Sequence, residues 1–386
     1  MSETATLGEL QNRGSLLLND GYRTKTTEMG PAGIPILRVA EVVDGAIHPA
    51  SADRIRNEFR SAIGLKMSQP GDVLLTTKGT VGRRVIMPQT PVQYAYSPQL
   101  CFFRVLDDSL DNKWLYYWLG SDGFWSQAGA FASQTDMAPY IALRDLRSVE
   151  VPIPPLAEQR RIAAVLGSFD DLIETNWALI ELLAQWVHSS VSTASELALL
   201  ADVADVAKPK QVRPRGSVAH YSLPAFDNGA CPDHVGGATI QSSKLPLSGP
   251  TVLVSRLNPQ WERCWMAYPS DNAVASTEFV PLMARFDVSP EEVWAVASSS
   301  GFWEQMRSHV TGTTGSHQRV DKAELLAMSV PDVRTLDPTT RSGIVDAVQG
   351  VQALRDEIAD LTRARDELLP LLMSGRVRVD ESLEVG

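Results

Sequence analysis

The chain has 386 residues, of which 44% are hydrophobic and 21% are charged, and its net charge is −11. This composition is typical of a soluble globular protein with two or three domains, and the negative net charge, taken for the whole chain, argues against a nucleic-acid binder. No uncharged apolar run approaches the ~18 residues that span a bilayer, and the N-terminus has no basic and apolar signal segment, so we expect a cytoplasmic protein.

The cysteines and histidines do not form a recognisable site. Cys101, Cys231 and Cys264 are scattered and include no CxxC pair, which favours reduced thiols over a disulfide framework. The six histidines do not pair at metal-ligand spacing. We therefore expect no metal in this chain.

The acidic surplus is concentrated in two segments. Residues 153–200 and 332–386 each carry a net charge of −4, whereas the two larger segments, 1–152 and 201–331, are close to neutral. A near-neutral domain can still present a basic face to nucleic acid.

The first larger segment contains short β-like runs separated by Pro, Gly, Asp and Asn, such as residues 73–77, 83–88 and 100–105. Residues 113–127 have helical spacing with aromatic side chains on one side. The second larger segment has the same mixture, with a β-like run at 251–255 and helical spacing at 290–309. This alternation predicts an α+β fold.

A long amphipathic helix is predicted after each of these segments, because apolar residues recur at steps of three and four. In the first helix they are Ile162, Leu166, Phe169, Ile173, Trp177, Ile180, Ala184 and Val187. In the second they are Ile344, Val348, Val351, Leu354, Ile358, Leu361, Leu368 and Leu372, with Arg365 in the same stripe. Two such helices in one chain favour antiparallel pairing as a coiled coil, although ordinary bundle helices would give the same pattern.

The second half of the sequence repeats the first in three ordered places, at a nearly constant offset in residue number. The matches are GDVLLT (71–76) with GPTVLVS (249–255), GFW (123–125) with GFW (301–303), and residues 141–152 with 320–331. A duplication of this kind predicts two similar globular domains related by a pseudo-two-fold axis. We expect the boundaries 1–152, 153–199, 200–332 and 333–376, followed by a tail at 377–386.

Three groups of residues are candidates for contact with DNA, because they combine cations, amides and glycines in probable loops. The first is the predicted hairpin with Lys78, Thr80, Arg83 and Arg84, together with Arg256 and Asn258 at the equivalent turn of the repeat. The second is the basic run with Lys208, Lys210, Arg213 and Arg215, which has no acid and whose prolines favour an extended strand. The third is a pair of polar loops with Gln134, Thr135, Thr314, His317, Gln318 and Arg319. Solvated surface loops would have a similar composition.

Several features typical of enzymes are missing from the sequence. It contains no Walker loop and no GxGxxG cradle, and no spaced set of Asp, Glu and Lys resembles a nuclease centre. We therefore expect a chain without catalytic residues, and we expect the aromatic residues of the two GFW motifs to be core residues.

The segment PIPPLAEQRRIA (152–163) and its continuation VLGSFDDLIETN (165–176) resemble the start of the first spacer helix in specificity subunits of type I restriction–modification enzymes. VLLTTKGTVGRR (73–84) also resembles a strand–turn–strand pattern of their target-recognition domains. The second connector, DPTTRSGIV (337–345), departs from the pattern and lacks the Glu-Gln pair.

The resemblance implies a non-catalytic subunit with two target-recognition domains and two long helices, which reads an asymmetric bipartite DNA sequence. It implies as partners double-stranded DNA, two adenine-N6 methyltransferase subunits and optionally a restriction subunit. Glu158, Gln159 and Arg160 are candidates for docking such a partner. S-adenosylmethionine, and ATP with Mg²⁺, would be bound by the partners and no cofactor by this chain. A specificity arm of another DNA-targeting defence complex, or a protein-interaction scaffold, would have a similar organisation.

Overall fold

The computed structural model of the chain describes residues 3–50, 53–132, 140–310 and 318–380. The chain divides into two compact units, unit 1 with residues 1–171 and 363–386, and unit 2 with residues 172–362. We call the globular part of unit 1 head 1 (residues 3–153) and that of unit 2 head 2 (residues 197–336). Among the described helices, none combines the length and the apolar character needed to cross a bilayer.

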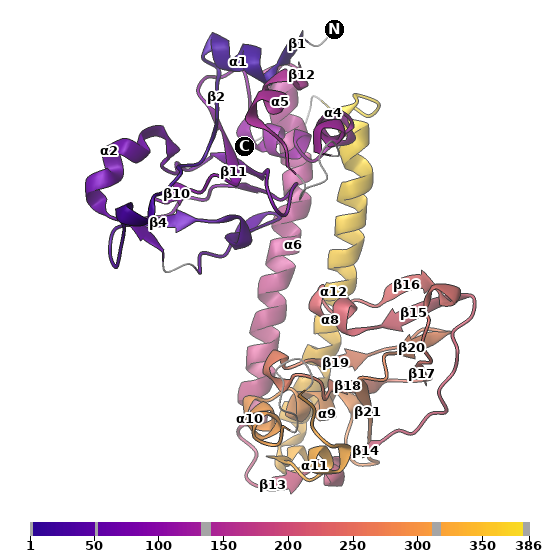
Figure 1. Ribbon diagram of the computed structural model, residues 1–386. Helices are drawn as coiled ribbons and strands as arrows, with labels where there is room; N and C mark the ends of the chain where they lie inside the picture. Colours follow the sequence, from indigo (N-terminus) through magenta and orange to yellow (C-terminus); the bar gives the residue numbers. More distant parts are fainter. Residues whose placement is uncertain (1–2, 51–52, 133–139, 311–317, 381–386) are drawn as a thin grey trace. The chain divides into compact units, whose positions relative to one another are not determined.

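Head 1 is a mixture of short strands and helices (Figure 1). Its strands are β1 (Glu3–Thr6), β2 (Leu16–Asp20), β3 (Met29–Gly30), β4 (Ile34–Leu37), β5 (Val42–Val43), β6 (Ala46–Ile47), β7 (Arg54–Ile55), β8 (Val73–Thr76), β9 (Arg84–Ile86), β10 (Ala95–Tyr96), β11 (Leu100–Val105) and β12 (Glu150–Ile153). Its helices are α1 (Leu7–Arg13), α2 (Arg60–Ile63), α3 (Asn112–Trp118), α4 (Asp122–Ala132) and α5 (Leu143–Ser148).

The central sheet of head 1 has the strand order β2–β11–β8–β9, and a second sheet has the order β10–β4–β7–β3. Because side chains alternate across a strand, the central sheet supplies two separate cores. Leu75 and Phe103 point into one core with the helices, and Leu74 and Phe102 point into the other with residues that include Tyr96. Burial on both faces explains why these strands have nearly continuous apolar sequences.

Head 2 has the same kind of architecture. Its strands are β13 (Leu197–Leu199), β14 (Ala204–Val206), β15 (Ser217–Tyr221), β16 (Asp233–Gly236), β17 (Leu245–Leu247), β18 (Thr251–Ser255), β19 (Cys264–Ala267), β20 (Ala273–Ala275), β21 (Phe279–Ala284) and β22 (Ser329–Pro331). Its helices are α7 (Leu200–Val203), α8 (Leu223–Asp227), α9 (Pro290–Ala297), α10 (Ser300–Ser308) and α11 (Lys322–Leu326). The α+β class predicted from the sequence is confirmed.

The central sheets of the two heads share strand order, and their middle strands share register. The central sheet of head 2 has the order β14–β21–β18–β19, which corresponds to β2–β11–β8–β9. Phe102 lies opposite Leu74 in head 1, and Pro281 lies opposite Leu253 in head 2. From head 1 to head 2, the residue numbers of both paired positions therefore increase by the same amount. The offset found in the sequence is therefore also the offset of the strand pairing.

The helical stretches predicted at 113–127 and 290–309 are each two helices rather than one. α3 and α4 are separated near Gly120, and α9 and α10 are separated at Ser298 and Ser299. Phe124, Phe302 and Trp303 are almost fully buried, which confirms that these aromatic residues of the GFW motifs are core residues. Trp125 is partly buried and packs against the head 1 core.

The two long helices, α6 (Leu156–Val191) and α12 (Pro338–Met373), have 36 residues each. Their apolar residues pack partly against the heads and partly against the other long helix within each unit. Ile162 and Leu166 complete the core of head 1, and Val187 and Ile344 complete that of head 2. A small separate cluster joins α6 to α12 in unit 2 through Ile180, Val351 and Ile358, with Ile173, Leu183 and Leu354 packed around them.

Within unit 2 the two helices are antiparallel, because Trp186 of α6 packs over Gly343 of α12 while Leu183 approaches Gly350. A Cβ atom on Gly343 would come within 2.7 Å of the Trp186 ring, so this position requires glycine or a shift of the ring. Within unit 1, Arg365 of α12 donates to Asp170 of α6 at 2.6 Å, and Tyr117 of α3 donates to the other oxygen of the same carboxylate. The charged residue in the apolar stripe is thereby paired.

Candidate nucleic-acid interface

The basic run of head 2 lies between β14 and β15. Lys208, Lys210, Arg213 and Arg215 are all exposed, and no ion pair joins any of them to another described residue. Val212, in the middle of the run, pairs with Lys244 as an antiparallel bridge, with backbone hydrogen bonds of 2.9 Å in both directions. The run is therefore anchored through its backbone while its four cations remain available to solvent.

Lys244 itself adds less to this positive surface. Its side chain is largely buried and donates to Ser242 Oγ at 2.6 Å, and burial lowers the pKa of its ammonium group. Burial and the nearby Lys244 also lower the pKa of the His220 imidazole on β15. The exposed charge of this region therefore comes from the four residues of the run.

The predicted hairpin of head 1 is confirmed as β8 and β9, which pair in the register Val73↔Ile86. Gly79 and Gly82 in its turn both have positive φ, 81° and 106°, a conformation that favours glycine. Thr80 lies between them and is exposed. The turn therefore brings main chain and a hydroxyl group to the surface.

The cations of this hairpin have partners within head 1. Arg83 donates to the carbonyl of Val42 at 3.1 Å. Arg84 donates to the carbonyl of Tyr116 at 2.8 Å and lies 4.9 Å from the centre of that ring. Because the Arg84 guanidinium fills the space beside Gly120, where a Cβ would lie 1.8 Å from it, this residue helps to hold the fold together. A role of Arg83 or Arg84 in DNA contact stays a prediction.

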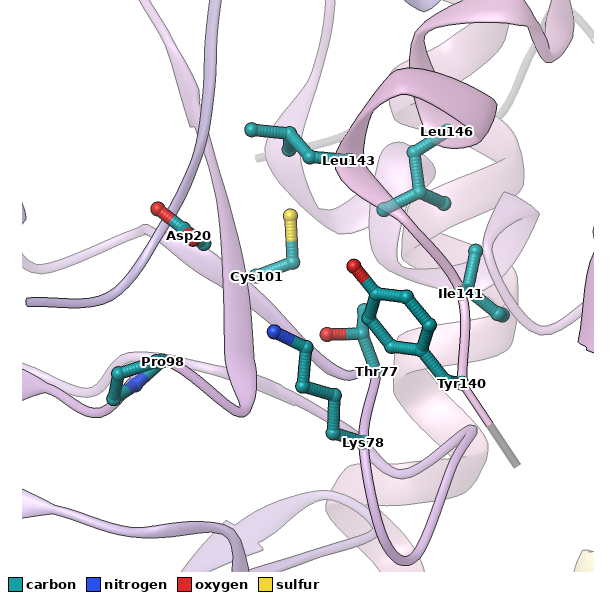
Figure 2. A pocket seen from close by; sticks show the side chains of 9 residues that line it. All are labelled: Asp20, Thr77, Lys78, Pro98, Cys101, Tyr140, Ile141, Leu143 and Leu146. Carbon is teal, nitrogen blue, oxygen red and sulfur yellow. The ribbon is translucent and has the colours of Figure 1, made fainter. Parts of the chain in front are cut away.

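Lys78 lies beside Tyr140, with its Nζ 4.8 Å from the ring centre (Figure 2). Both residues line a cavity of about 20 Å³, which also contacts Asp20 and Cys101. This volume holds about one water molecule and excludes a nucleic-acid base. Burial raises the pKa of the Cys101 thiol, so the cavity contains a neutral, unreactive sulfur.

At the equivalent turn of head 2, Arg256 and Asn258 follow β18 and meet the segment that carries Gln318 and Arg319. The backbone N–H of Asn258 donates to the carbonyl of Gln318 at 2.9 Å, and the backbone N–H of Val320 donates to the carbonyl of Arg256 at 3.2 Å. Arg319 forms an ion pair with Glu278 at 2.9 Å. The structure thus brings together two groups of predicted residues that lie far apart in sequence. Gln134, Thr135, Thr314 and His317 lie outside the described residues.

The residues predicted to dock a partner, Glu158, Gln159 and Arg160, lie in the first turn of α6 but differ in exposure. Gln159 is 0% exposed. Its oxygen accepts from the backbone N–H of Asp111 at 2.8 Å, and its nitrogen donates to the carbonyls of Ser109 and Pro154 at 3.0 and 2.9 Å. The Gln159 side chain therefore joins the long helix to head 1 and has no surface to offer a partner. Glu158 is half-buried and Arg160 is exposed, so the docking prediction rests on these two residues.

Head 2 has a different side chain near the corresponding position. Arg341, in the first turn of α12, donates to the buried Glu292 near the start of α9, with its Nη2 at 3.0 Å, and to the carbonyl of Asp287 at 2.7 Å. Both helices are thus joined to the first turn of a head helix, α3 or α9. The loss of the Glu-Gln pair from the second connector is compensated by an ion pair.

Residues that the sequence analysis did not single out also repeat. Gln127 donates to the carbonyls of Gly123 and Glu150, and accepts from the backbone N–H of Glu150. Gln305 makes the same three bonds with Gly301 and Ser329. The extended motif GFW-x-Q, present in both halves of the sequence, was the signal for this pair.

Comparison with known proteins finds a family model that matches part of this chain. The family model described as type I restriction modification DNA specificity domain matches residues 33–185. Over these residues the chain is similar to the type I restriction–modification DNA specificity domain family. The resemblance seen in the sequence is therefore confirmed over these residues.

Two curated relatives of the specificity domain come from Methanocaldococcus jannaschii. The type I restriction enzyme MjaVIII specificity subunit is 24% identical over 161 residues, which are 41% of this chain and 38% of that protein. The putative type I restriction enzyme MjaX specificity subunit is 28% identical over 164 residues, 39% of this chain and 36% of that protein. The chain therefore matches less than half the length of either relative.

A solved structure extends the likeness in fold. The S subunit of a type I restriction–modification system from M. genitalium superposes with a TM-score of 0.58, covering 99% of this chain and 97% of that one, at 16% sequence identity. The specificity-domain match covers most of head 1 and α6 but not head 2. Head 2 nevertheless has the same strand register in its central sheet and the same contacts at Gln305 that head 1 has at Gln127. Head 2 therefore resembles head 1 in domain architecture.

Proposed function

We propose that the chain is the DNA specificity subunit of a type I restriction–modification complex, and that each head binds one half of an asymmetric bipartite target. The observation that carries this proposal is the duplication of one scaffold within one chain, with one copy in a recognised DNA specificity domain. Since the heads differ in their surface turns, the two half-sites should differ in sequence.

The long helices would set the separation of the half-sites. A helix of 36 residues is about 54 Å long at ~1.5 Å per residue, enough to separate two readers by at least one turn of DNA, roughly 34–36 Å. We propose that α6 and α12 form one antiparallel coiled coil that relates the heads by a pseudo-two-fold axis. The antiparallel contacts within unit 2 support this arrangement.

The modification chemistry would belong to partner subunits. Two copies of an adenine-N6 methyltransferase that uses S-adenosylmethionine would dock on this chain, flip one adenine in each half-site out of the duplex and methylate it. A restriction subunit that uses ATP and Mg²⁺ could join the same complex. An exposed apolar stripe on α6, with Leu172, Leu179, Leu182 and Trp186, supports docking of a partner helix along this surface.

Mapping of methylated adenines tests the proposal. In a cell that carries this chain and its methyltransferase partner, we expect one methylated motif with two short specified parts and a fixed unspecified gap. Deletion of the chain should abolish that methylation, because the partner would lose its DNA reader. Methylation that is unchanged in the deletion strain, or a motif without a gap, would contradict the proposal.

A further inference from the structure

We propose that each head selects bases with a short surface segment, which we call a ledge. In head 1 the ledge forms where the turn after β8 meets the segment before α5, and in head 2 it forms where the turn after β18 meets the segment before α11. Ledge 1 comprises residues 77–79 and 140–141, and ledge 2 comprises residues 256–258 and 318–320. The proposal rests on the proposed DNA-reading function and assigns its specificity to particular side chains.

The two ledges have the same backbone. Lys78 pairs with Tyr140 and Leu257 pairs with Arg319, each as an isolated antiparallel bridge. Beside these bridges, Ile141 donates to the carbonyl of Thr77 at 3.0 Å, just as Val320 donates to that of Arg256 at 3.2 Å. All these partners are displaced by the offset of the sequence repeat, so the bridge belongs to the duplicated scaffold.

The side chains of the ledges are different in every paired position. Thr77, Lys78, Gly79 and Tyr140 of ledge 1 correspond to Arg256, Leu257, Asn258 and Arg319 of ledge 2. Two positions beside these four keep their character: Ser255 replaces Thr76, and Val320 replaces Ile141 at the inner end of each ledge. A conserved backbone that presents divergent polar side chains is what two readers of different half-sites require.

At one pair of equivalent positions, Gly79 and Asn258, the backbone conformation is of the same kind and only the side chain differs. Gly79 has φ 81° and Asn258 has φ 50°, so both turns use the left-handed region that glycine and asparagine tolerate best. Ledge 2 therefore presents a carboxamide where ledge 1 presents only main chain.

Two side chains of ledge 2, those of Arg256 and Asn258, each carry a polar atom that has no hydrogen-bond partner among the described residues. Within the described part of the chain, Arg256 Nε and Asn258 Oδ1 are buried without a hydrogen bond, and so is Oε2 of Glu278, whose Oε1 pairs with Arg319. Asn258 precedes the turn at Pro259–Trp261 but makes no capping bond with its side chain. Rotation of the Asn258 carboxamide towards a base edge would therefore break no hydrogen bond at Oδ1. Binding to the base would give Oδ1 a hydrogen-bond donor, and a buried acceptor without a donor is costly.

The chemistry of the two side chains suits the edges of purines. A carboxamide offers one donor and one acceptor, which match N7 and N6 of adenine, and a guanidinium matches O6 and N7 of guanine. Ledge 1 has no amide among its described residues and presents Lys78 with Tyr140 instead. We therefore assign Asn258 as a specificity-determining residue for one half of the target.

The substitution Asn258→Gly tests this assignment, because glycine keeps the left-handed turn and removes only the amide. In the complex with the methyltransferase partner, mapping of methylated adenines should show one position of one half-site becoming degenerate. Discrimination at that position should fall by about 10–100-fold, the loss expected for one bidentate base contact. Asn258→Asp, which also tolerates the left-handed turn, should alter the same position.

The converse substitution, Gly79→Asn, should alter only the other half-site. Gly14 provides a matched control, since its φ is also 81° and no atom lies within 4 Å of the place where its Cβ would be. Gly14→Asn should therefore leave the whole motif unchanged.

The ledge proposal would be overturned if Asn258→Gly and Asn258→Asp unfolded thermally like the wild type and produced the same methylated motif. The proposed DNA-reading function would remain intact in that case. The ledge proposal would also be overturned if Gly79→Asn and Asn258→Gly altered the same half-site. If the wild-type complex itself produced no motif, the proposed function would fail instead, so the two failures are distinguishable.

Discussion

Replacing Lys208, Lys210, Arg213 and Arg215 together with glutamine is expected to weaken DNA binding by about 10²–10³-fold near physiological salt. The four cations are exposed, lie on an anchored extended segment and have no acidic partner among the described residues, so their charge is available to phosphates. Each phosphate contact contributes ~0.9 to the salt dependence, because binding releases condensed counterions. The slope of log K against log salt should therefore fall by about three to four.

The measurement is a salt titration of DNA affinity, made with the methyltransferase partner present. A suitable control replaces the exposed residues Arg13, Arg144, Arg285 and Lys322, which removes the same charge from other surfaces. The methylated motif should remain the same in the variant of the run, since phosphate contacts carry no sequence information. An unaltered salt slope in that variant would show that the run does not touch DNA.

Asp72→Ala should lower the free energy of unfolding of head 1 by about 3–5 kcal/mol, or roughly 8–15 °C in Tm. Asp72 is 0% exposed and accepts two bonds from Arg104 at 2.7 and 2.8 Å and one from Tyr96 at 2.7 Å. Its removal leaves the Arg104 guanidinium, which is only 7% exposed, without its counter-ion. Hydrogen exchange along β11 reports on this head without depending on head 2.

The chain itself offers the control for this prediction. Head 2 has Thr251 and Met283 at the positions that correspond to Asp72 and Arg104. The double substitution Asp72→Thr with Arg104→Met should therefore recover a large part of the lost stability, because it leaves no unpaired charge in the core. A double variant as unstable as Asp72→Ala would contradict this account of the ion pair.

The sequence predicted those features that repeat locally. Alternation in strands such as residues 100–105, and apolar steps of three and four in the long helices, follow from local geometry and were readable without a structure. The internal repeat then predicted two heads of one kind. The break between α3 and α4 was missed, because two short helices with one apolar face have the same periodicity as a single helix.

The roles of single polar residues depended on distant parts of the chain. Gln159 belongs to a motif that suggests an exposed docking surface, yet its amide is used by Asp111 and Ser109, which lie far from it in sequence. Arg84 similarly has a sequence context typical of a DNA contact, yet its guanidinium lies against Tyr116 and Gly120. Which of the candidate cations are engaged within the protein depends on the fold, and the four of the run at 208–215 are exposed and have no ion pair with another described residue.

Helix length gives the most direct test of the central claim that two heads in one chain read two separated half-sites. Insertion of four residues into both α6 and α12 lengthens each helix by about 6 Å, or about two base pairs of DNA. Mapping of methylated adenines should then show the same two half-sites with a longer gap. An unchanged gap in a folded, methylation-competent complex would contradict the claim.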